Sequence, residues 1–126
     1  MLNKQLVNPD SIVVIGGSND IKKPGGKIIK NISEGDFAGE LFIVNPHERQ
    51  VQGLDCVQTV DELPQVNLAI LVVPAKHCLG IIEKLVDNNG TKAFIILSAG
   101  FGEAGEDGAI LESKIAEVIN RAGACL

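Results

Sequence analysis

A glycine-rich loop that also carries lysine follows the first apolar run of the chain. The run covers Ser11–Ile15, and residues 16–27 read GGSNDIKKPGGK before a helical spacing of isoleucines begins at Ile28. Backbone N–H groups at the start of a helix, together with the positive end of its dipole, attract anions, and glycine lets the backbone approach a ligand closely. The order of strand, glycine loop and helix therefore predicts a site for the phosphates of a nucleotide.

The loop departs from two well-known phosphate-binding motifs. After Gly16, the dinucleotide motif G-x-G-x-x-G requires glycine at two positions that are Ser18 and Ile21 in this chain. The dinucleotide motif also requires an acid after the second strand, where the chain has Asn45-Pro46. The P-loop motif fails as well, because isoleucine rather than serine or threonine follows Lys27. Both NAD and ATP are therefore disfavoured as ligands.

Three further loop-like segments follow apolar runs, and each is rich in proline, glycine or small residues. They are Asn45-Pro46, Val73-Pro74-Ala75 and Ser98-Ala99-Gly100. In an open parallel sheet, ligands bind beyond the carboxyl ends of the strands, so these segments and the first loop are predicted to form one site. Five of the eleven basic residues support an anionic ligand there: Lys22, Lys23, Lys27, Lys30 and Arg49. A solvated charged surface is the alternative interpretation of those five.

Composition limits the class of protein. The chain has 126 residues, of which 45% are hydrophobic, so it fits one domain with an ordinary core. Its net charge of −5 argues against broad nucleic-acid binding. Its three cysteines are too few and too widely spaced for a zinc motif or a disulfide scaffold, and no metal site is predicted. The absence of a visible signal peptide or membrane span indicates a cytoplasmic protein.

Apolar runs alternate with helical patterns along the chain. Strands are expected at residues 11–15, 41–44, 68–73 and 93–97, with a weak strand near 54–57 and the opening of another at 122–126. Helical spacing occurs around residues 28–32, 78–86 and 111–119, with one helical turn near 60–64. This alternation predicts an α/β fold, a Rossmann-like, doubly wound, mainly parallel sheet with helices on both faces. Residues 1–126 form one domain, and because the chain stops where a strand begins, we expect it to be a fragment of a longer multidomain chain.

The order of these segments resembles the coenzyme A-binding domain of the nucleoside-diphosphate-forming acyl-CoA synthetases. The resemblance rests on Gly16-Gly17-Ser18, Lys23-Pro24-Gly25-Gly26, Val44-Asn45-Pro46, Val73-Pro74-Ala75 and the sequence SAGFGEAG at residues 98–105. It extends over essentially the whole chain and is greatest for ADP-forming acetyl-CoA synthetases, relatives of the α subunit of succinyl-CoA synthetase. Each motif is weak alone, and the specific feature is their shared order and spacing.

The resemblance implies a role in coenzyme A binding for each segment. The first loop would contact the phosphates through Gly16, Ser18, Lys23, Pro24 and Gly25, together with Gly17, where many relatives have alanine. Asn45 and Pro46 would lie near the adenosine, with Arg49 or His47 as the partner of the 3′-phosphate. Val73, Pro74 and Ala75 would line the path of adenine and pantetheine, and Ser98, Ala99 and Gly100 would lie near the thiol.

Several single residues have simpler interpretations. Lys22 and Lys23 are adjacent, so at most one is expected to face the phosphates; the match to the family motif favours Lys23, and Lys22 is expected to be solvated. His77 is expected to be exposed or to cap a helix, because no acid or nucleophile is placed beside it by spacing. Cys78 lies on the apolar helical face and is expected in the core. Glu103 is the one carboxylate kept as a functional candidate.

The predicted function is binding of coenzyme A in an ADP-forming acyl-CoA synthetase, which the resemblance implies interconverts acyl-CoA, ADP and phosphate with acid, coenzyme A and ATP. The phosphohistidine segment and the ATP-grasp part of that family have no match here. They are therefore expected as partner domains or subunits, and this chain alone is predicted to bind but not to catalyse. The alternatives are a stand-alone coenzyme A-binding regulatory protein and, with less support, an NAD(H)-sensing Rossmann module.

Overall fold

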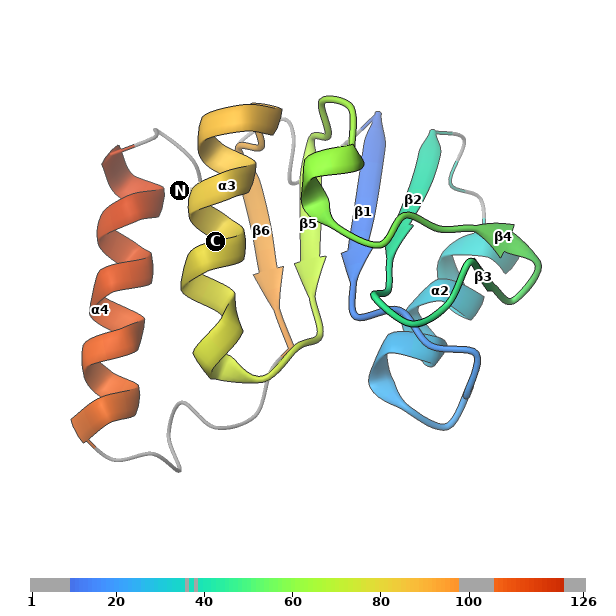
Figure 1. Ribbon diagram of the computed structural model, residues 1–126, viewed down its shortest axis with the longest axis horizontal. Coiled ribbons are helices and arrows are strands. Elements are labelled where there is room, and N and C mark those ends of the chain that lie inside the picture. The colour runs from blue at the N-terminus through green and yellow to red at the C-terminus, as the bar shows by residue number, and fades with distance from the viewer. Residues whose placement is uncertain (1–9, 36, 38, 98–105, 122–126) are drawn as a thin grey trace.

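A computed structural model describes residues 10–35, 37, 39–97 and 106–121 (Figure 1). Its main sheet has four parallel strands: β1 (Ser11–Ile15), β2 (Glu40–Val44), β5 (Leu68–Leu71) and β6 (Ala93–Ile96). They stand in the order β2-β1-β5-β6, with Val13 paired to Phe42 on one side and to Ala69 on the other. The strand order therefore reverses between β1 and β5, and the predicted α/β, doubly wound fold is confirmed.

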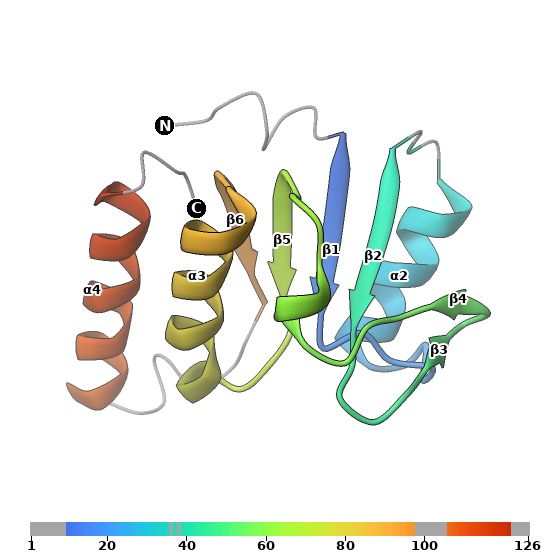
Figure 2. The same ribbon diagram turned by 45° about the horizontal axis from the view of Figure 1, so that its top comes forward.

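Helices cover both faces of this sheet, as Figure 2 shows. Helix α2 (Pro24–Glu34) packs on one face, where Ile29 joins a buried cluster with Val14 and Ile43. Helices α3 (Ala75–Asn89) and α4 (Glu106–Arg121) pack on the other. The faces separate because successive residues of a strand point to opposite sides, so neighbours such as Val13 and Val14 enter different clusters.

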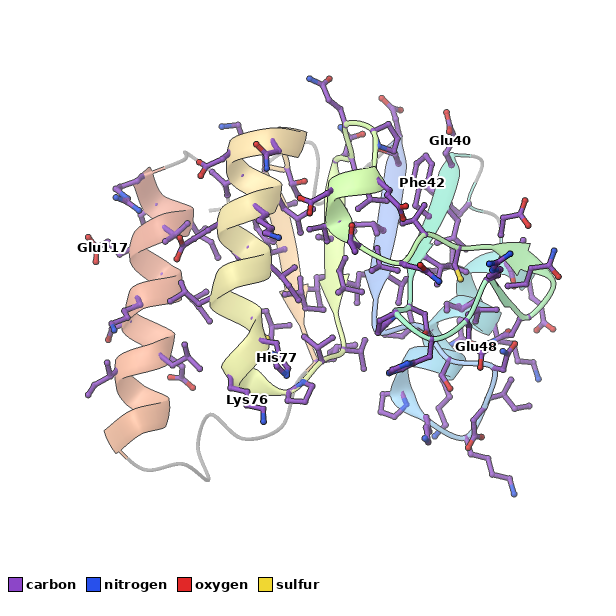
Figure 3. The ribbon with its side chains drawn as sticks, viewed as in Figure 1. Glu40, Phe42, Glu48, Lys76, His77 and Glu117 are labelled. Carbon is purple, nitrogen blue, oxygen red and sulfur yellow. The ribbon has the colours of Figure 1, made fainter. Side chains whose placement is uncertain are left out.

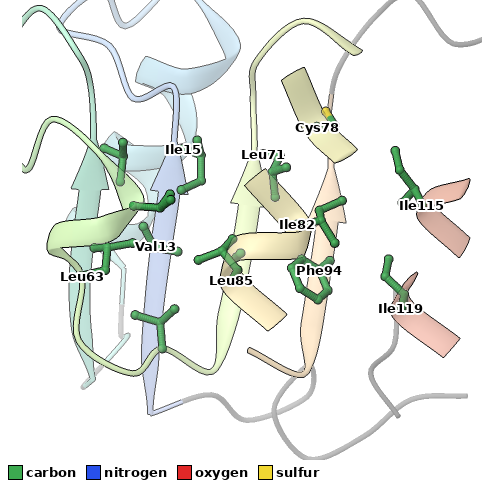
Figure 4. Packing of buried hydrophobic residues seen from close by; sticks show 14 of the residues in the cluster. Val13, Ile15, Leu63, Leu71, Cys78, Ile82, Leu85, Phe94, Ile115 and Ile119 are labelled. Carbon is green, nitrogen blue, oxygen red and sulfur yellow. The ribbon is translucent and has the colours of Figure 1, made fainter. Parts of the chain in front are cut away.

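The larger of these clusters lies between the sheet and α3 and α4 (Figure 4). Cys78, Ile82 and Leu85 of α3 are fully buried against Phe94 of β6, and Ile115 of α4 closes the far side. The spacing of i, i+4 and i+7 puts these three α3 side chains on one helical face. Cys78 is thus a core residue, as expected from the sequence.

Helix boundaries follow local residue chemistry. Proline begins α2, where its fixed φ suits the first helical position and its missing N–H costs nothing. Gly35 follows the last residue of α2, and Gly90 ends α3 in the left-handed conformation with φ +63°. Both helices therefore end at a glycine.

The connection between β2 and β5 differs from the prediction. The expected weak strand at 54–57 is short: β4 (Leu54–Asp55) pairs antiparallel with β3 (Gln50–Val51) in a hairpin outside the main sheet. Val57, from the same expected strand, pairs with the main sheet through an isolated parallel bridge to Val44. The predicted helical turn is present as the 3-10 helix η1 (Val60–Glu62).

The sequence also predicts where β5 ends and a strand near the C-terminus. Strand β5 ends at Leu71, two residues before the predicted end, because after the bond from the Val72 N–H to the Ile15 carbonyl (2.8 Å) the chain turns toward Pro74 and α3. The predicted strand at 122–126 lies outside the described residues. Among the helices of the described ranges, none has the length and apolar character needed to cross a membrane.

Candidate functional site

The glycine loop between β1 and α2 packs backbone against backbone. Gly16 has φ +93°, and a side chain there would collide with the Val72 carbonyl oxygen of the neighbouring strand end. A side chain at Gly25 would meet the carbonyl oxygen of Gly16, and one at Gly26 would meet that of Asp20. These contacts explain why glycine is needed here: the first turn of α2 lies directly on the loop that precedes it.

The start of α2 has the features of an anion site. Lys23 is the N-cap of α2, and no side chain caps the helix there. Gly25 and Gly26 are buried in the first turn, whose N–H groups precede the regular helical hydrogen bonds. Lys22, Lys23 and Lys27 are exposed around it. The arrangement of free N–H groups, helix dipole and cations is one that binds phosphate.

The loop also has its own hydrogen bonds. The Asp20 N–H donates to Ser18 Oγ (3.0 Å), and the Asp20 carboxylate accepts the Lys22 N–H (2.9 Å). The Lys23 N–H donates to the Asp20 carbonyl (3.1 Å). The Ser18 hydroxyl is the acceptor in the bond from Asp20, so its proton can be donated to a ligand.

Asn45 ties the second loop to the first. Its Nδ2 donates to the Gly17 carbonyl (2.9 Å), and its Oδ1 accepts the N–H groups of His47 (2.8 Å) and Glu48 (3.1 Å). The Gly16 N–H donates in turn to the Val44 carbonyl (3.0 Å). The side chain of Asn45 therefore orders the loops by bonds within the protein.

A cleft of about 560 Å³ opens at the carboxyl ends of β1, β2 and β5. Gly16, Pro46 and Val73, three of the residues predicted for the site, line it together. The cleft lies where the strand order reverses, which is the expected ligand position in an open parallel sheet. The structure thus brings the first, second and third predicted segments to one place.

Helix α3 supplies basic side chains that the sequence prediction left out. Lys76, His77 and Lys84 line the cleft, and Figure 3 shows Lys76 and His77 at the start of the helix. Lys84 also pairs with Asp61 of η1 at 3.5 Å, and both side chains are more than half exposed. No side chain caps α3 at Pro74, so a second helix N-terminus faces the same edge of the sheet. In the sequence, Lys76 and His77 directly follow the third segment, and this position could have indicated basic side chains in the cleft.

Gln58, Thr59 and Val60 complete the cleft from the segment before β5. Gln58 also borders a second cavity, of about 390 Å³, which Arg49 and Cys56 line. Arg49 therefore lies beside the main cleft and not in it. Burial, together with the carboxylates of Glu48 and Asp55, raises the pKa of the Cys56 thiol, so that this cysteine stays protonated and is a weak nucleophile.

The remaining predicted residues have varied positions. Lys23, Pro24 and Pro74 are exposed at the starts of α2 and α3, and Gly17 is buried against Ile29 and Ile43. Ala75 is the first residue of α3. The fourth segment, Ser98, Ala99 and Gly100, and the candidate Glu103 lie outside the described residues. Within the described ranges, no three His, Cys, Asp or Glu side chains are grouped as a metal site.

The chain is similar in sequence to known proteins. The chain is 40% identical over 119 residues to subunit alpha of acetate–CoA ligase [ADP-forming] II from Pyrococcus furiosus, which covers 92% of this chain and 25% of that protein. It is also 40% identical over 124 residues to acetate–CoA ligase [ADP-forming] I from Archaeoglobus fulgidus, covering 95% of this chain and 17% of the relative. The chain thus spans a quarter or less of the length of these relatives.

A solved structure has the same fold over nearly the whole chain. The apo form of the dinucleotide-forming acetyl-coenzyme A synthetase 1 of Ca. Korarchaeum cryptofilum matches with a TM-score of 0.86 and 30% identity, covering 98% of this chain and 27% of that one. Residues 10–126 match the family described as the CoA binding domain. The resemblance drawn from the sequence is confirmed, and this chain belongs to the CoA binding domain family.

Proposed function

We propose that the chain binds coenzyme A for an ADP-forming acyl-CoA synthetase. The observation that carries the proposal is that the glycine loop before α2, through Gly16, and the uncapped start of α3, through Lys76 and His77, line one cleft where the strand order reverses. An uncapped helix N-terminus favours anions, and the cleft itself is lined mainly by apolar side chains such as Ile15, Val60 and Ile81. A long ligand with several phosphates and an apolar portion suits this combination.

The diphosphate is assigned to the first loop. Gly17, Ser18 and Gly25 would offer backbone N–H groups, Ser18 also its hydroxyl, and Lys23 a charge. Gly16 would let the backbone approach the ligand, and Pro24 would fix the start of α2. Val73, Pro74 and Ala75 would line the path of the adenine and pantetheine along the cleft. The thiol end is assigned to Ser98, Ala99 and Gly100 on the basis of family resemblance alone.

The adenosine end is assigned to the second loop. Pro46 lines the cleft, and Asn45 holds the loop in place through its bonds to Gly17, His47 and Glu48. Arg49 would bind the 3′-phosphate from the adjoining cavity, because Gln58 borders both spaces. A guanidinium is well suited to such a phosphate.

The reaction of the whole enzyme would need partners. In this proposal, succinyl-CoA-synthetase-like and ATP-grasp domains or subunits supply the acyl phosphate, the phosphohistidine and the nucleotide, and residues 1–126 act in a cytoplasmic enzyme as its coenzyme A-binding domain. The chain itself contributes binding and orientation of the coenzyme. The stand-alone regulatory protein differs from this only in lacking those partners.

Calorimetric titration tests the proposal. Coenzyme A, NADH and ATP are titrated separately into the chain at one salt concentration. We expect heat of binding for coenzyme A with one site, and none for NADH at equal concentration. Binding of NADH without binding of coenzyme A would overturn the proposal in favour of an NAD(H)-sensing module.

A further inference from the structure

The β3-β4 hairpin has an unusual turn. Its two central residues are Gln52, with φ +52°, and Gly53, with φ +80°. Two-residue turns with both φ angles positive favour asparagine, aspartate or glycine at the first position. Gln52 is the one non-glycine residue with positive φ in the described part of the chain. A residue held in this conformation must be fixed by its surroundings.

Those surroundings are the glycine loop. Gln52 Nε2 donates to the carbonyl of Ser18 (2.9 Å) and to the carbonyl of Gly26 (2.9 Å). Ser18 lies at the start of the loop, and Gly26 lies in the first turn of α2. Both partners are carbonyl oxygens, so only the amide nitrogen can make these bonds, and it uses both of its hydrogens. One side chain therefore holds the two ends of the loop together.

Two further hydrogen bonds join the backbone of the hairpin to Asn19 of the glycine loop. The Gln52 N–H donates to Asn19 Oδ1, at 2.6 Å, and Asn19 Nδ2 donates to the Gln50 carbonyl (3.3 Å). The hairpin itself is anchored by Val51, which is fully buried in a cluster with Ile29 of α2. Val51 thus attaches the hairpin to the core, and the turn residue Gln52 bonds to the glycine loop.

These bonds determine which way the loop presents its peptide groups. The Ser18 carbonyl is directed at Gln52, and in a trans peptide the N–H of the same unit, that of Asn19, is directed the opposite way. Holding the carbonyl oxygens toward the hairpin keeps negative partial charge away from the face on which an anion would bind. It also keeps the loop closed on the start of α2.

We infer that Gln52 is a positioning residue: it preorganises the glycine loop and the start of α2 for the phosphates of coenzyme A. The inference rests on the proposed function. Gln52 does not line the cleft, and its amide is engaged by the protein. It acts on the ligand through Ser18 and Gly26.

The variant Gln52→Gly separates positioning from a merely structural role. Glycine relieves the positive φ at this position, and this gain offsets the loss of the two amide hydrogen bonds, so the thermal unfolding midpoint is expected to change little. The affinity for coenzyme A is expected to fall about tenfold, which corresponds to loss of about one net hydrogen bond. The amides of Lys22 and Lys23, bonded within the loop, are expected to exchange faster in the ligand-free variant. Gln65→Gly, at an exposed position before β5, is the control and should keep the affinity.

The outcomes are distinct. Unchanged affinity in Gln52→Gly, with the unaltered chain binding coenzyme A, would overturn the role of Gln52 and leave the proposed function in place. Failure of the unaltered chain to bind coenzyme A would overturn both. If Gln52→Gly does not fold, Gln52→Asn retains a residue that favours the turn but carries a shorter amide, and the same loss of affinity is expected.

Discussion

At the scale of single residues, the site divides into groups that the protein uses and groups left for a ligand. The Asn45 side chain is bonded to three backbone groups, and the Gln52 amide to two. Lys23 has an exposed side chain and stands at the N-cap of α2. Direct contact with phosphate is therefore expected from Lys23, whereas Asn45 and Gln52 are expected to act by ordering the loops.

Lys23→Ala tests the direct contact. We expect the variant to lose about 1–3 kcal/mol of binding free energy for coenzyme A, because a charge-assisted contact is removed. The matched control is Lys114→Ala, because Lys114 is an exposed lysine of α4. Calorimetric titration measures the affinity of both variants for coenzyme A. Equal affinities in the two variants would remove Lys23 from the site.

Arg49→Ala tests the assignment of the 3′-phosphate. The unaltered chain is expected to bind coenzyme A more tightly than its 3′-dephospho form, and Arg49→Ala should bind the two alike because the phosphate has lost its partner. Competition titrations with both ligands measure this coupling. If the losses from the substitution and from the missing phosphate simply add, Arg49 does not contact that phosphate.

Thr91 provides a residue-scale test of the fold. Its Oγ1 is fully buried with no hydrogen-bond partner in the described part of the chain. Thr91→Val should raise the free energy of unfolding by about 1 kcal/mol, because the desolvated hydroxyl is replaced by a methyl group of similar size. Urea unfolding measures the change. Thr91→Ser retains the hydroxyl and should be no more stable than the unaltered chain; a gain equal to that of valine would contradict the explanation.

At the scale of elements, two helices differ in how tightly they meet their neighbours. Helix α2 begins directly on the glycine loop, so that Gly25 has no room for a side chain. Helix α3 contains Gly80, where a Cβ would meet nothing within 4 Å. The same residue type thus serves close packing in one helix and lies in open space in the other.

Alanine at these two positions should have opposite effects. Gly80→Ala is expected to stabilise the chain by up to about 1 kcal/mol, because alanine favours the helix interior. Gly25→Ala is expected to destabilise it by about 1–3 kcal/mol through collision with the Gly16 carbonyl. Denaturant unfolding of both variants checks the pair. A Gly25→Ala variant as stable as Gly80→Ala would show that α2 can move away from its loop.

Much of this element structure could be predicted from sequence because its signals are local. Runs such as Ser11–Ile15 and the one-sided spacing of Cys78, Ile82 and Leu85 determine strands and helices by themselves. The β3-β4 hairpin could not be recognised, because Gln52-Gly53 lacks the Asn-Gly or Asp-Gly signature of such turns. The place of Lys84 in the cleft depends on how α3 docks on the sheet, which no local pattern encodes.

At the scale of the whole molecule, the doubly wound sheet brings separate loops together. Crossovers leave β1 in one direction and β5 in the other, so the loops that follow them flank the same gap. This explains why Gly16, Pro46 and Val73, far apart in sequence, line one cleft. The candidate site is thus a consequence of topology.

The isolated chain should bind without catalysis. Because the acyl phosphate and nucleotide are assigned to other domains, we expect no acyl-CoA when the chain is incubated with acid, ATP and coenzyme A. A coupled assay for ADP release, with buffer as the blank, measures this. Formation of acyl-CoA by this chain would contradict the proposal that other domains or subunits supply the acyl phosphate and the nucleotide.

The most direct test of the central claim is an NMR titration of the ¹⁵N-labelled chain with coenzyme A. The account predicts that shift changes concentrate in residues 16–27, 45–49 and 73–77, at the carboxyl ends of the strands. Amides at the opposite edge, around Asn67 and Thr91, should keep their positions. Changes confined to that opposite edge, or no changes at saturating coenzyme A, would contradict the account.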